Sequence, residues 1–195
     1  MRGFLAGIAV TLIVVFGGGY LAINRGWIPV GADNPPGSWE RSLAHMAVDT
    51  YVEAHAPKQE NPAAPTAANL GEGARIYEAR CALCHGSGRQ RISPLRTKFS
   101  PPAPQLVNRV PRDPDANFWW ITKHGVRLTG MPAWDGILTD DEMWKTVSFL
   151  KHWDKLPPEA VAAWETAAGG PLQPPQPAAR QPGSAGAPQG AAASK

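Results

Sequence analysis

Cysteine is nearly absent from this sequence. Only two cysteines occur in 195 residues, and both stand in one short run, Cys81-Ala82-Leu83-Cys84-His85. A zinc site needs about four ligands, and no second Cys/His pair is suitably spaced. A thioredoxin-like C-x-x-C motif needs a βαβ setting, and nothing nearby has that pattern. A disulfide between these two residues would close a very small loop. A zinc site, a thioredoxin-like redox motif and a structural disulfide are therefore the less favoured interpretations of the two cysteines.

Two further absences bound the fold and the partners. No segment alternates polar and apolar residues convincingly, so the part of the chain outside a membrane is predicted to be all-α. The net charge is only +3, from 19 basic and 16 acidic residues, and no basic run is interleaved with stacking aromatic residues. This pattern favours an anionic membrane surface or an acidic protein partner and argues against nucleic acid.

The two cysteines belong to a C-x-x-C-H motif. This pattern is typical of haem attached covalently through two thioether bonds. His85 directly follows the second cysteine, which puts its imidazole under the porphyrin as an axial ligand of the iron. The sequence therefore predicts one haem c, held by Cys81, Cys84 and His85. Covalent haem attachment takes place outside the cytosol, so an export signal is expected at the N-terminus.

Residues 3–23 meet that expectation, because they contain no charged side chain. At about 1.5 Å per residue they span a hydrocarbon core of ~30 Å. The alternative is a cleaved signal peptide, but the apolar run continues past the three glycines at residues 17–19. We therefore predict an uncleaved anchor over residues 1–25. The protein would cross the inner (cytoplasmic) membrane once, with its haem domain in the periplasm.

Three segments follow the predicted anchor. Residues 26–68 comprise a turn-rich exit from the membrane, a helix capped by Ser38 that runs to about His55, and a Pro/Ala linker. Residues 69–156 form the predicted haem domain, whose middle is rich in Gly, Pro and Arg and has little periodicity. Residues 157–195 hold one short helix and then, from Gly169, a Pro/Gly/Ala tail that cannot bury enough surface to order itself.

Three helices are predicted within the haem domain, each opening at polar residues that can cap it. The caps and helices are Asn69 with Glu72 for residues 70–80, Asp115 for residues 116–123, and Thr139 with Glu142 for residues 140–153.

Three motifs stand in a fixed order along residues 70–156. Gly73-x-x-x-Tyr77 precedes the C-x-x-C-H run, Gly130-Met131-Pro132-Ala133-Trp134 lies downstream, and the capped helix opens as Leu138-Thr-Asp-Asp-Glu-Met-Trp. Together they resemble class I cytochrome c, most closely its membrane-anchored bacterial members with one haem. The resemblance implies that Met131 is the second axial ligand, and a soft, neutral thioether raises the potential of a His-ligated haem. His124 is the alternative and would give a bis-His haem of lower potential.

The resemblance also implies supporting roles for other residues. In the family, a proline carbonyl within a P-x-L pattern accepts the second ring N–H of the ligating histidine. Pro104 is favoured for this role, and Pro94 is the alternative. Tyr77 and Trp144 match positions at which the family's helices cross, so both are expected to pack. Trp134 is expected either to donate its indole N–H to a haem propionate or to pack in the core.

A basic cluster follows the haem motif, made up of Arg89, Arg91, Arg96 and Lys98. It is either a solvated loop or a set of cations that pair with haem propionates or attract an acidic redox partner.

The predicted function is single-electron transfer in a respiratory chain, between redox partner proteins that are expected among membrane complexes. Six-coordinate iron leaves no open position for a substrate, so the chain alone is predicted to be an electron carrier and not an enzyme. The first alternative is a haem c subunit of a larger membrane oxidoreductase, a dehydrogenase or a terminal oxidase. The second is a haem-based sensor, which would need a labile Met131.

Overall fold

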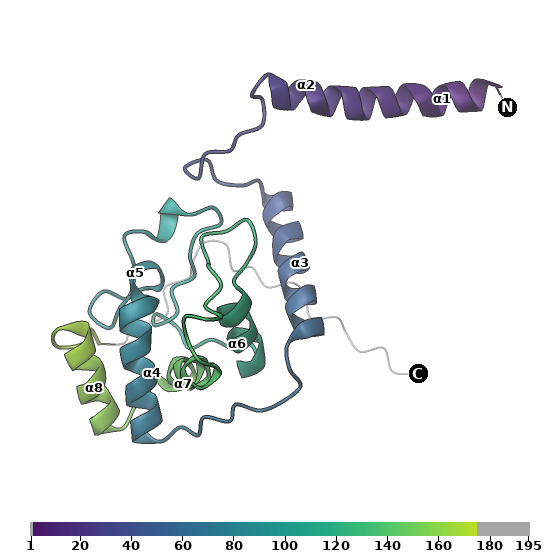
Figure 1. The fold of residues 1–195 in the computed structure, drawn as a ribbon. Coiled ribbons are helices and arrows are strands. Elements are labelled where there is room, and N and C mark those ends of the chain that lie inside the picture. The colour runs from purple at the N-terminus through teal and green to yellow at the C-terminus, as the bar shows by residue number, and fades with distance from the viewer. Residues whose placement is uncertain (1, 175–195) are drawn as a thin grey trace, which may run out of the picture.

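The computed structural model describes residues 2–174 (Figure 1). These residues form helices and loops without a strand, as predicted. From residue 175 on, the predicted tail lies outside the described residues. The elements are α1 (Arg2–Leu12), the π-helical turn η1 (Ile13–Gly17), α2 (Gly18–Asn24), α3 (Ser38–His55), α4 (Ala67–Arg80), α5 (Ala82–His85), the 3₁₀ turn η2 (Arg96–Lys98), α6 (Asp115–His124), α7 (Asp140–His152) and α8 (Pro158–Ala168).

The first three elements make one helix over Arg2–Asn24 that stands apart from the rest of the chain (Figure 1). It buries no residue, so apolar side chains are exposed on all its sides. By length and composition this helix is able to cross a membrane. A helix that is apolar all round is typical of an apolar environment.

The main core lies between α4, α7 and α8. The ring of Tyr77 on α4 packs against Phe149 on α7, with centroids 5.5 Å apart. Trp164 on α8 meets Phe149 edge-on, with centroids 4.9 Å apart. All three side chains are fully buried. The packed unit therefore includes α8, which the predicted domain limits assign to the segment after residue 156.

The close crossing of α4 and α7 depends on Gly73. A Cβ atom at this position would lie 2.2 Å from the carbonyl oxygen of Lys145, so only glycine permits the approach. Tyr77, one turn further along the same face, extends the contact. Trp144 also packs, as predicted, but against α6: its ring stacks on Trp119 with centroids 5.2 Å apart.

The helix α3 and the linker after it lie against the folded unit. Val52 of α3 packs in a cluster with Ala116 of α6 and Trp144 of α7. In the linker, the side-chain amide of Asn61 donates to a carboxylate oxygen of Asp115 at 3.1 Å and to the carbonyl of Trp144 at 3.2 Å. The C-terminal half of α3 is thereby docked on α6.

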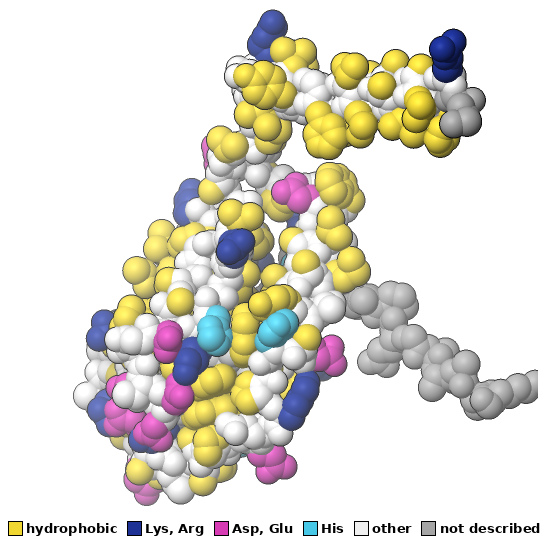
Figure 2. All heavy atoms as spheres, turned by 45° about the vertical axis from the view of Figure 1, so that its right-hand side comes forward, with side chains coloured by type: hydrophobic (Ala, Val, Ile, Leu, Met, Phe, Trp, Pro, Cys, Tyr) yellow, Lys and Arg dark blue, Asp and Glu magenta, His cyan; other side chains and the backbone are white. Residues whose placement is uncertain are grey.

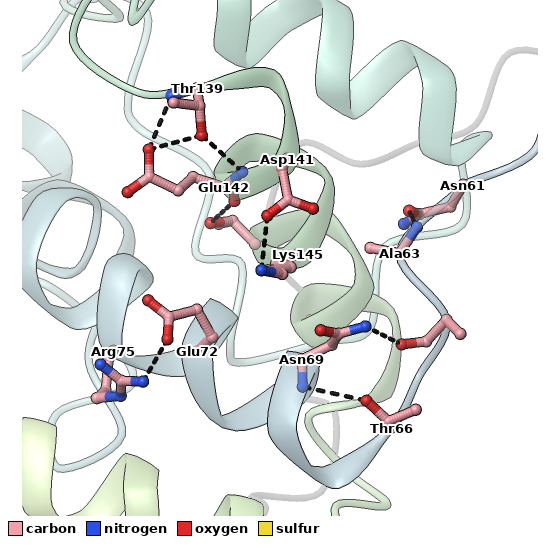
Figure 3. Close-up of polar contacts among 12 residues, drawn as sticks. Asn61, Ala63, Thr66, Asn69, Glu72, Arg75, Thr139, Asp141, Glu142 and Lys145 are labelled. Carbon is pink, nitrogen blue, oxygen red and sulfur yellow. Dashed lines mark hydrogen bonds and ion pairs between the residues drawn. The ribbon is translucent and has the colours of Figure 1, made fainter.

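Three helices begin differently from the prediction. α4 starts at Ala67, because Thr66 is its cap and accepts a hydrogen bond from the Asn69 N–H at 3.2 Å (Figure 3). Ser38 is the first residue of α3, since Gly37 holds the extended conformation before it. Asp115 likewise lies inside α6 and follows its cap, Pro114.

The capping box predicted for α7 is confirmed (Figure 3). The Thr139 hydroxyl accepts a hydrogen bond from the Glu142 N–H at 3.2 Å, and the Glu142 carboxylate accepts one from the Thr139 N–H at 2.8 Å. This backbone hydrogen bond lowers the pKa of Glu142, because it stabilises the charged carboxylate.

We expect Gly73→Ala to destabilise the protein. The overpacking cost of about 1–3 kcal/mol opposes a helix-propensity gain of about 1 kcal/mol, and here the added methyl would meet backbone atoms, which cannot move aside. With the cost at the upper end of that range, the net loss is about 2 kcal/mol, which corresponds to a fall of roughly 4–8 °C in the Tm of the solubilised protein.

Gly71→Ala is the matched control for this prediction. Its added Cβ would lie 3.1 Å from the Cβ of Ala163 on α8, and a shift of a few tenths of an ångström relieves that contact. The Tm of this variant should stay near the wild-type value. An unchanged or higher Tm for Gly73→Ala would contradict the tight α4–α7 crossing.

Candidate functional site

The C-x-x-C-H run sits where α4 ends and the one-turn helix α5 begins. The Cys81 N–H donates to the carbonyl of Tyr77 at 2.8 Å, and the His85 N–H donates to the carbonyl of Cys81 at 2.9 Å. Gly86 ends the turn at φ 86°, where a Cβ would lie 2.2 Å from the carbonyl oxygen of Arg91. Both cysteines are half-buried free thiols, so the turn presents two thiols and an imidazole together.

The hydroxyl of Tyr77 holds the end of this turn. Its hydroxyl donates to the carbonyl of Gly86 at 2.6 Å and lies 3.1 Å from that of His85. Burial, followed by the nearby Cys81 and Glu78, raises the pKa of Tyr77 well above its ordinary value. The phenol therefore stays protonated and remains a donor.

The ring of His85 is oriented by Pro104. Its Nδ1 lies 2.7 Å from the carbonyl oxygen of Pro104. Because a carbonyl can only accept, Nδ1 carries the proton and Nε2 is left free to bind a metal. Burial lowers the pKa of His85, and the hydrogen bond to Pro104 opposes that shift. Lowering the pKa favours the neutral imidazole that ligation requires.

Gln105, next to Pro104, joins three segments of the site. Its side chain is buried; the amide nitrogen donates to the carbonyls of Cys84 at 3.1 Å and Ala103 at 2.9 Å. Its amide oxygen accepts from the Ser93 N–H at 2.6 Å. This linking role of Gln105 was not predicted, because the only sequence signal for it was the position of Gln105 inside the P-x-L pattern.

Met131 lies half-buried on a tight loop between α6 and α7. Gly125 opens the loop at φ 67°, where a Cβ would lie 2.8 Å from the carbonyl oxygen of Met131. The Met131 N–H donates to the hydroxyl of Thr129 at 3.0 Å. A Cβ on Gly130 would lie 2.4 Å from the ring of Phe99, so this loop touches the segment that leads to Pro104. Among the described residues, no hydrogen bond joins the loop to His85.

Trp134 and His124 lie on either side of this loop. Trp134 packs against a small cluster that contains Leu138 and Met143, which is one of the two roles predicted for it. Its hydrogen bond to a haem propionate stays a prediction. His124 is exposed at the end of α6 and lies against Trp120, with ring centroids 4.6 Å apart.

Arg91 differs from a solvated loop residue and from a cation that attracts a partner, because its side chain is buried between Val107 and the rings of Trp153 and Trp164. Pairing of the basic cluster with haem propionates stays a prediction. Residues 169–174 also depart from the predicted disorder, because they hydrogen-bond to Arg89 and Arg91.

The donor set fits a covalently bound haem. Two thiols three residues apart and an imidazole with a free Nε2 are the groups that attach and ligate a haem c. In addition, the buried indole N–H groups of Trp119 and Trp153 have no acceptor among the described residues, which costs about 1–3 kcal/mol each.

Comparison with known proteins agrees with this geometry. Residues 68–150 match the family model described as cytochrome c oxidase, cbb3-type, subunit III. Neither the curated proteins nor the solved structures yielded a match. The matched segment, which spans nearly all of α4 through α7, belongs to the class I cytochrome c family. A domain of this class implies haem c and electron transfer, as the motifs predicted.

We expect Tyr77→Phe to lower the free energy of unfolding by about 1–2 kcal/mol at pH 7, because it leaves the buried carbonyl of Gly86 without its donor. The difference should shrink at high pH. Unfolded tyrosine titrates near ~10, whereas the folded state holds this proton more tightly, so the contribution of Tyr77 is complete below pH ~10 and is lost as the pH rises further.

Thermal melts of both proteins between pH 8 and about 11 measure this effect. Tyr51→Phe is the control, since that side chain is 55% exposed and its hydroxyl loss should change stability by less than about 0.5 kcal/mol. A wild-type minus Tyr77→Phe difference that is independent of pH would contradict the buried neutral phenol.

Proposed function

We propose that the protein is a membrane-anchored electron carrier with one haem c, bound through Cys81 and Cys84 and ligated axially by His85 and Met131. The observation that carries the proposal is the hydrogen bond from His85 Nδ1 to the carbonyl of Pro104, which leaves Nε2 free beside two thiols. When bound, the haem supplies reversible one-electron chemistry at its iron.

The chain's own residues would hold and tune that group. The Pro104 carbonyl fixes the His85 tautomer and makes Nε2 a better ligand. Met131 contributes a neutral, soft sulfur that raises the potential. In this proposal Trp134 donates its indole N–H to a propionate. With both axial positions filled by protein, no open site remains for a substrate, which fits a carrier and not an enzyme.

The helix Arg2–Asn24 would keep the carrier in the inner membrane as a single span. Two observations support this: its apolar side chains have no protein to pack on, and covalent haem attachment requires the domain to lie outside the cytosol. Residues 25–37 would then connect the membrane to α3. Such a tether raises the effective concentration of the haem domain near membrane-bound redox partners, which we place in a respiratory chain.

Optical spectra of the purified full chain test the ligands. The ferric protein should be low-spin with the weak sulfur-to-iron charge-transfer band, and the ferrous protein should not bind carbon monoxide. In Met131→Leu the band should vanish and carbon monoxide should bind, because the sixth position opens.

Met143→Leu is the matched control, a nearly volume-conserving change of a fully buried methionine in α7. It should retain the band and exclude carbon monoxide. Absence of the band in the wild type, with carbon monoxide binding in His124→Ala but not in Met131→Leu, would assign the ligand to His124. Ready binding of carbon monoxide by the wild type would favour a sensor over a carrier.

A second candidate function, a haem c subunit of a larger membrane oxidoreductase, is favoured by one surface. Three large apolar side chains of α3 are exposed, Trp39 by 74%, Leu43 by 52% and Met46 by 59%. Their spacing places them on one side of α3, opposite Val52, which packs on α6. Figure 2 shows hydrophobic side chains along α3, below the membrane helix. The matching family model is itself described as an oxidase subunit.

Native gels of gently solubilised membranes, stained for haem, distinguish the two functions. A complex subunit should migrate with a larger assembly in the wild type and alone in Leu43→Glu, because a charge in the apolar stripe prevents its burial. Ala44→Glu places the same charge one residue further along the sequence, on another side of α3, and should leave the assembly intact. Migration of the wild type alone would support the free carrier.

A further inference from the structure

Arg91 is a buried cation that the ligand set does not use. Its side chain is 3% exposed. Nη1 donates to the carbonyl of Val107 at 2.6 Å, Nε donates to the carbonyl of Gln173 at 3.1 Å, and Nη2 donates to the same Gln173 oxygen. The guanidinium carbon lies 4.6 Å from the centroid of the Trp153 ring. Among the described residues, no carboxylate forms an ion pair with it.

This one side chain joins three segments of the chain. Arg91 belongs to the loop that directly follows the C-x-x-C-H run. Val107 comes three residues after Pro104, and the Leu106 N–H between them donates to the carbonyl of His85 at 3.1 Å. Gln173 lies beyond α8. The guanidinium therefore ties Gln173 to both segments that hold His85.

Further contacts hold the residues that follow α8 against the same loop. The Gln173 N–H donates to the carbonyl of Gly88 at 2.8 Å, and the Arg89 guanidinium donates to the carbonyl of Gly169 at 3.1 Å. A Cβ on Gly88 would lie 2.5 Å from the side chain of Leu172, so the two backbones approach closely. Residues 169–174 thus lie as a strap across the loop that follows the C-x-x-C-H run.

Glu78 on α4 binds the same loop. Its carboxylate accepts hydrogen bonds from the Gly88 N–H at 2.6 Å and from the indole N–H of Trp164 at 2.5 Å. The loop is therefore fastened to α4 and α8 at once. A lysine in place of Arg91 would keep the charge but lacks the planar fork that reaches two carbonyls simultaneously.

We propose that Arg91 and residues 169–174 form a clamp that positions His85 and thereby sets the redox potential and the ligand stability of the haem. Arg91 is a positioning residue, since it acts on His85 through the segment containing Pro104. Loosening the clamp lets that segment move, which weakens the hydrogen bond to His85 Nδ1. The inference rests on the proposed ligation by His85 and Met131.

Two substitutions and two truncations test the clamp first. Arg91→Leu removes the guanidinium, and a chain ending at Gly170 removes Gln173. A chain ending at Pro174 keeps every residue of the clamp and is the control for the truncation. Gln173→Ala is the control for the side chain, because Arg91 and Gly88 bond only to the backbone of Gln173.

Three readouts are measured: the midpoint potential, the affinity of the ferric protein for added imidazole, and hydrogen exchange of the Leu106 amide. In the chain ending at Gly170 the potential should rise, because a weaker hydrogen bond to Nδ1 makes His85 a poorer donor to the ferric iron. Arg91→Leu also removes a buried positive charge, so its potential should lie below that of the truncation. In both variants imidazole should bind at least about fivefold more tightly, because the loosened segment also touches the Met131 loop through Phe99, and the Leu106 amide should exchange at least about fivefold faster. The two controls should match the wild type.

Arg91→Lys separates charge from geometry. It should bind imidazole as Arg91→Leu does, since the fork is lost, while its potential should lie above that of Arg91→Leu because the positive charge remains. If Arg91→Leu does not fold, the chain ending at Gly170 decides alone. Wild-type values of all three readouts in that truncation would overturn the clamp. Absence of the sulfur-to-iron band in the wild type would instead overturn the proposed function.

Discussion

The hydrogen bond between His85 Nδ1 and the Pro104 carbonyl is the contact on which the rest of the site depends. It joins residues 19 apart in sequence, and neither end lies in a long helix. Its geometry therefore has to be imposed from outside, by Tyr77 holding the turn of α5 and by Gln105 holding the segment around Pro104. The other polar contacts of this region serve mainly to keep these two short segments at hydrogen-bonding distance.

This dependence explains the unusual role of buried polar side chains in the domain. Between α5 and α6 the chain has only one 3₁₀ turn, so most of its backbone groups have no helical partner. Buried backbone groups must nevertheless be satisfied. Gln105, Ser93 and Arg91 supply the missing donors and acceptors from side chains. A loop-rich domain can thus be ordered without strands, provided that a few long polar side chains reach across it.

Sequence reasoning succeeded where the evidence is local. The Thr139–Glu142 box and the helical periodicities each depend on residues a few positions apart, and the structure has the predicted α7 cap and an all-α fold. It failed where the hydrogen-bond partner is distant in sequence or is a backbone group. Arg91 bonds to backbone carbonyls 16 and 82 residues away, and any residue type offers a carbonyl. The ordered conformation of residues 169–174 was not predicted for the same reason. Their composition alone predicts disorder, and their partners lie far away in sequence. The start of α4 was misplaced because Thr66 and Asn69 are both good caps.

The two candidate iron ligands are supported from opposite ends of the chain. The N-terminal part reaches the Met131 side, because α3 packs on α6 and α6 ends at Gly125, where the Met131 loop begins. The C-terminal part reaches the His85 side through Arg91 and the strap after α8. The two supports meet where Phe99, in the segment that leads to Pro104, contacts Gly130 of the Met131 loop. A partner that displaced α3 would act first on Met131, which in the proposed ligation would be the weaker and more replaceable of the two ligands. A change at the C-terminal strap would act on the imidazole, whose basicity depends on its carbonyl partner. In the proposed ligation, the domain thus offers two structural routes to one redox potential.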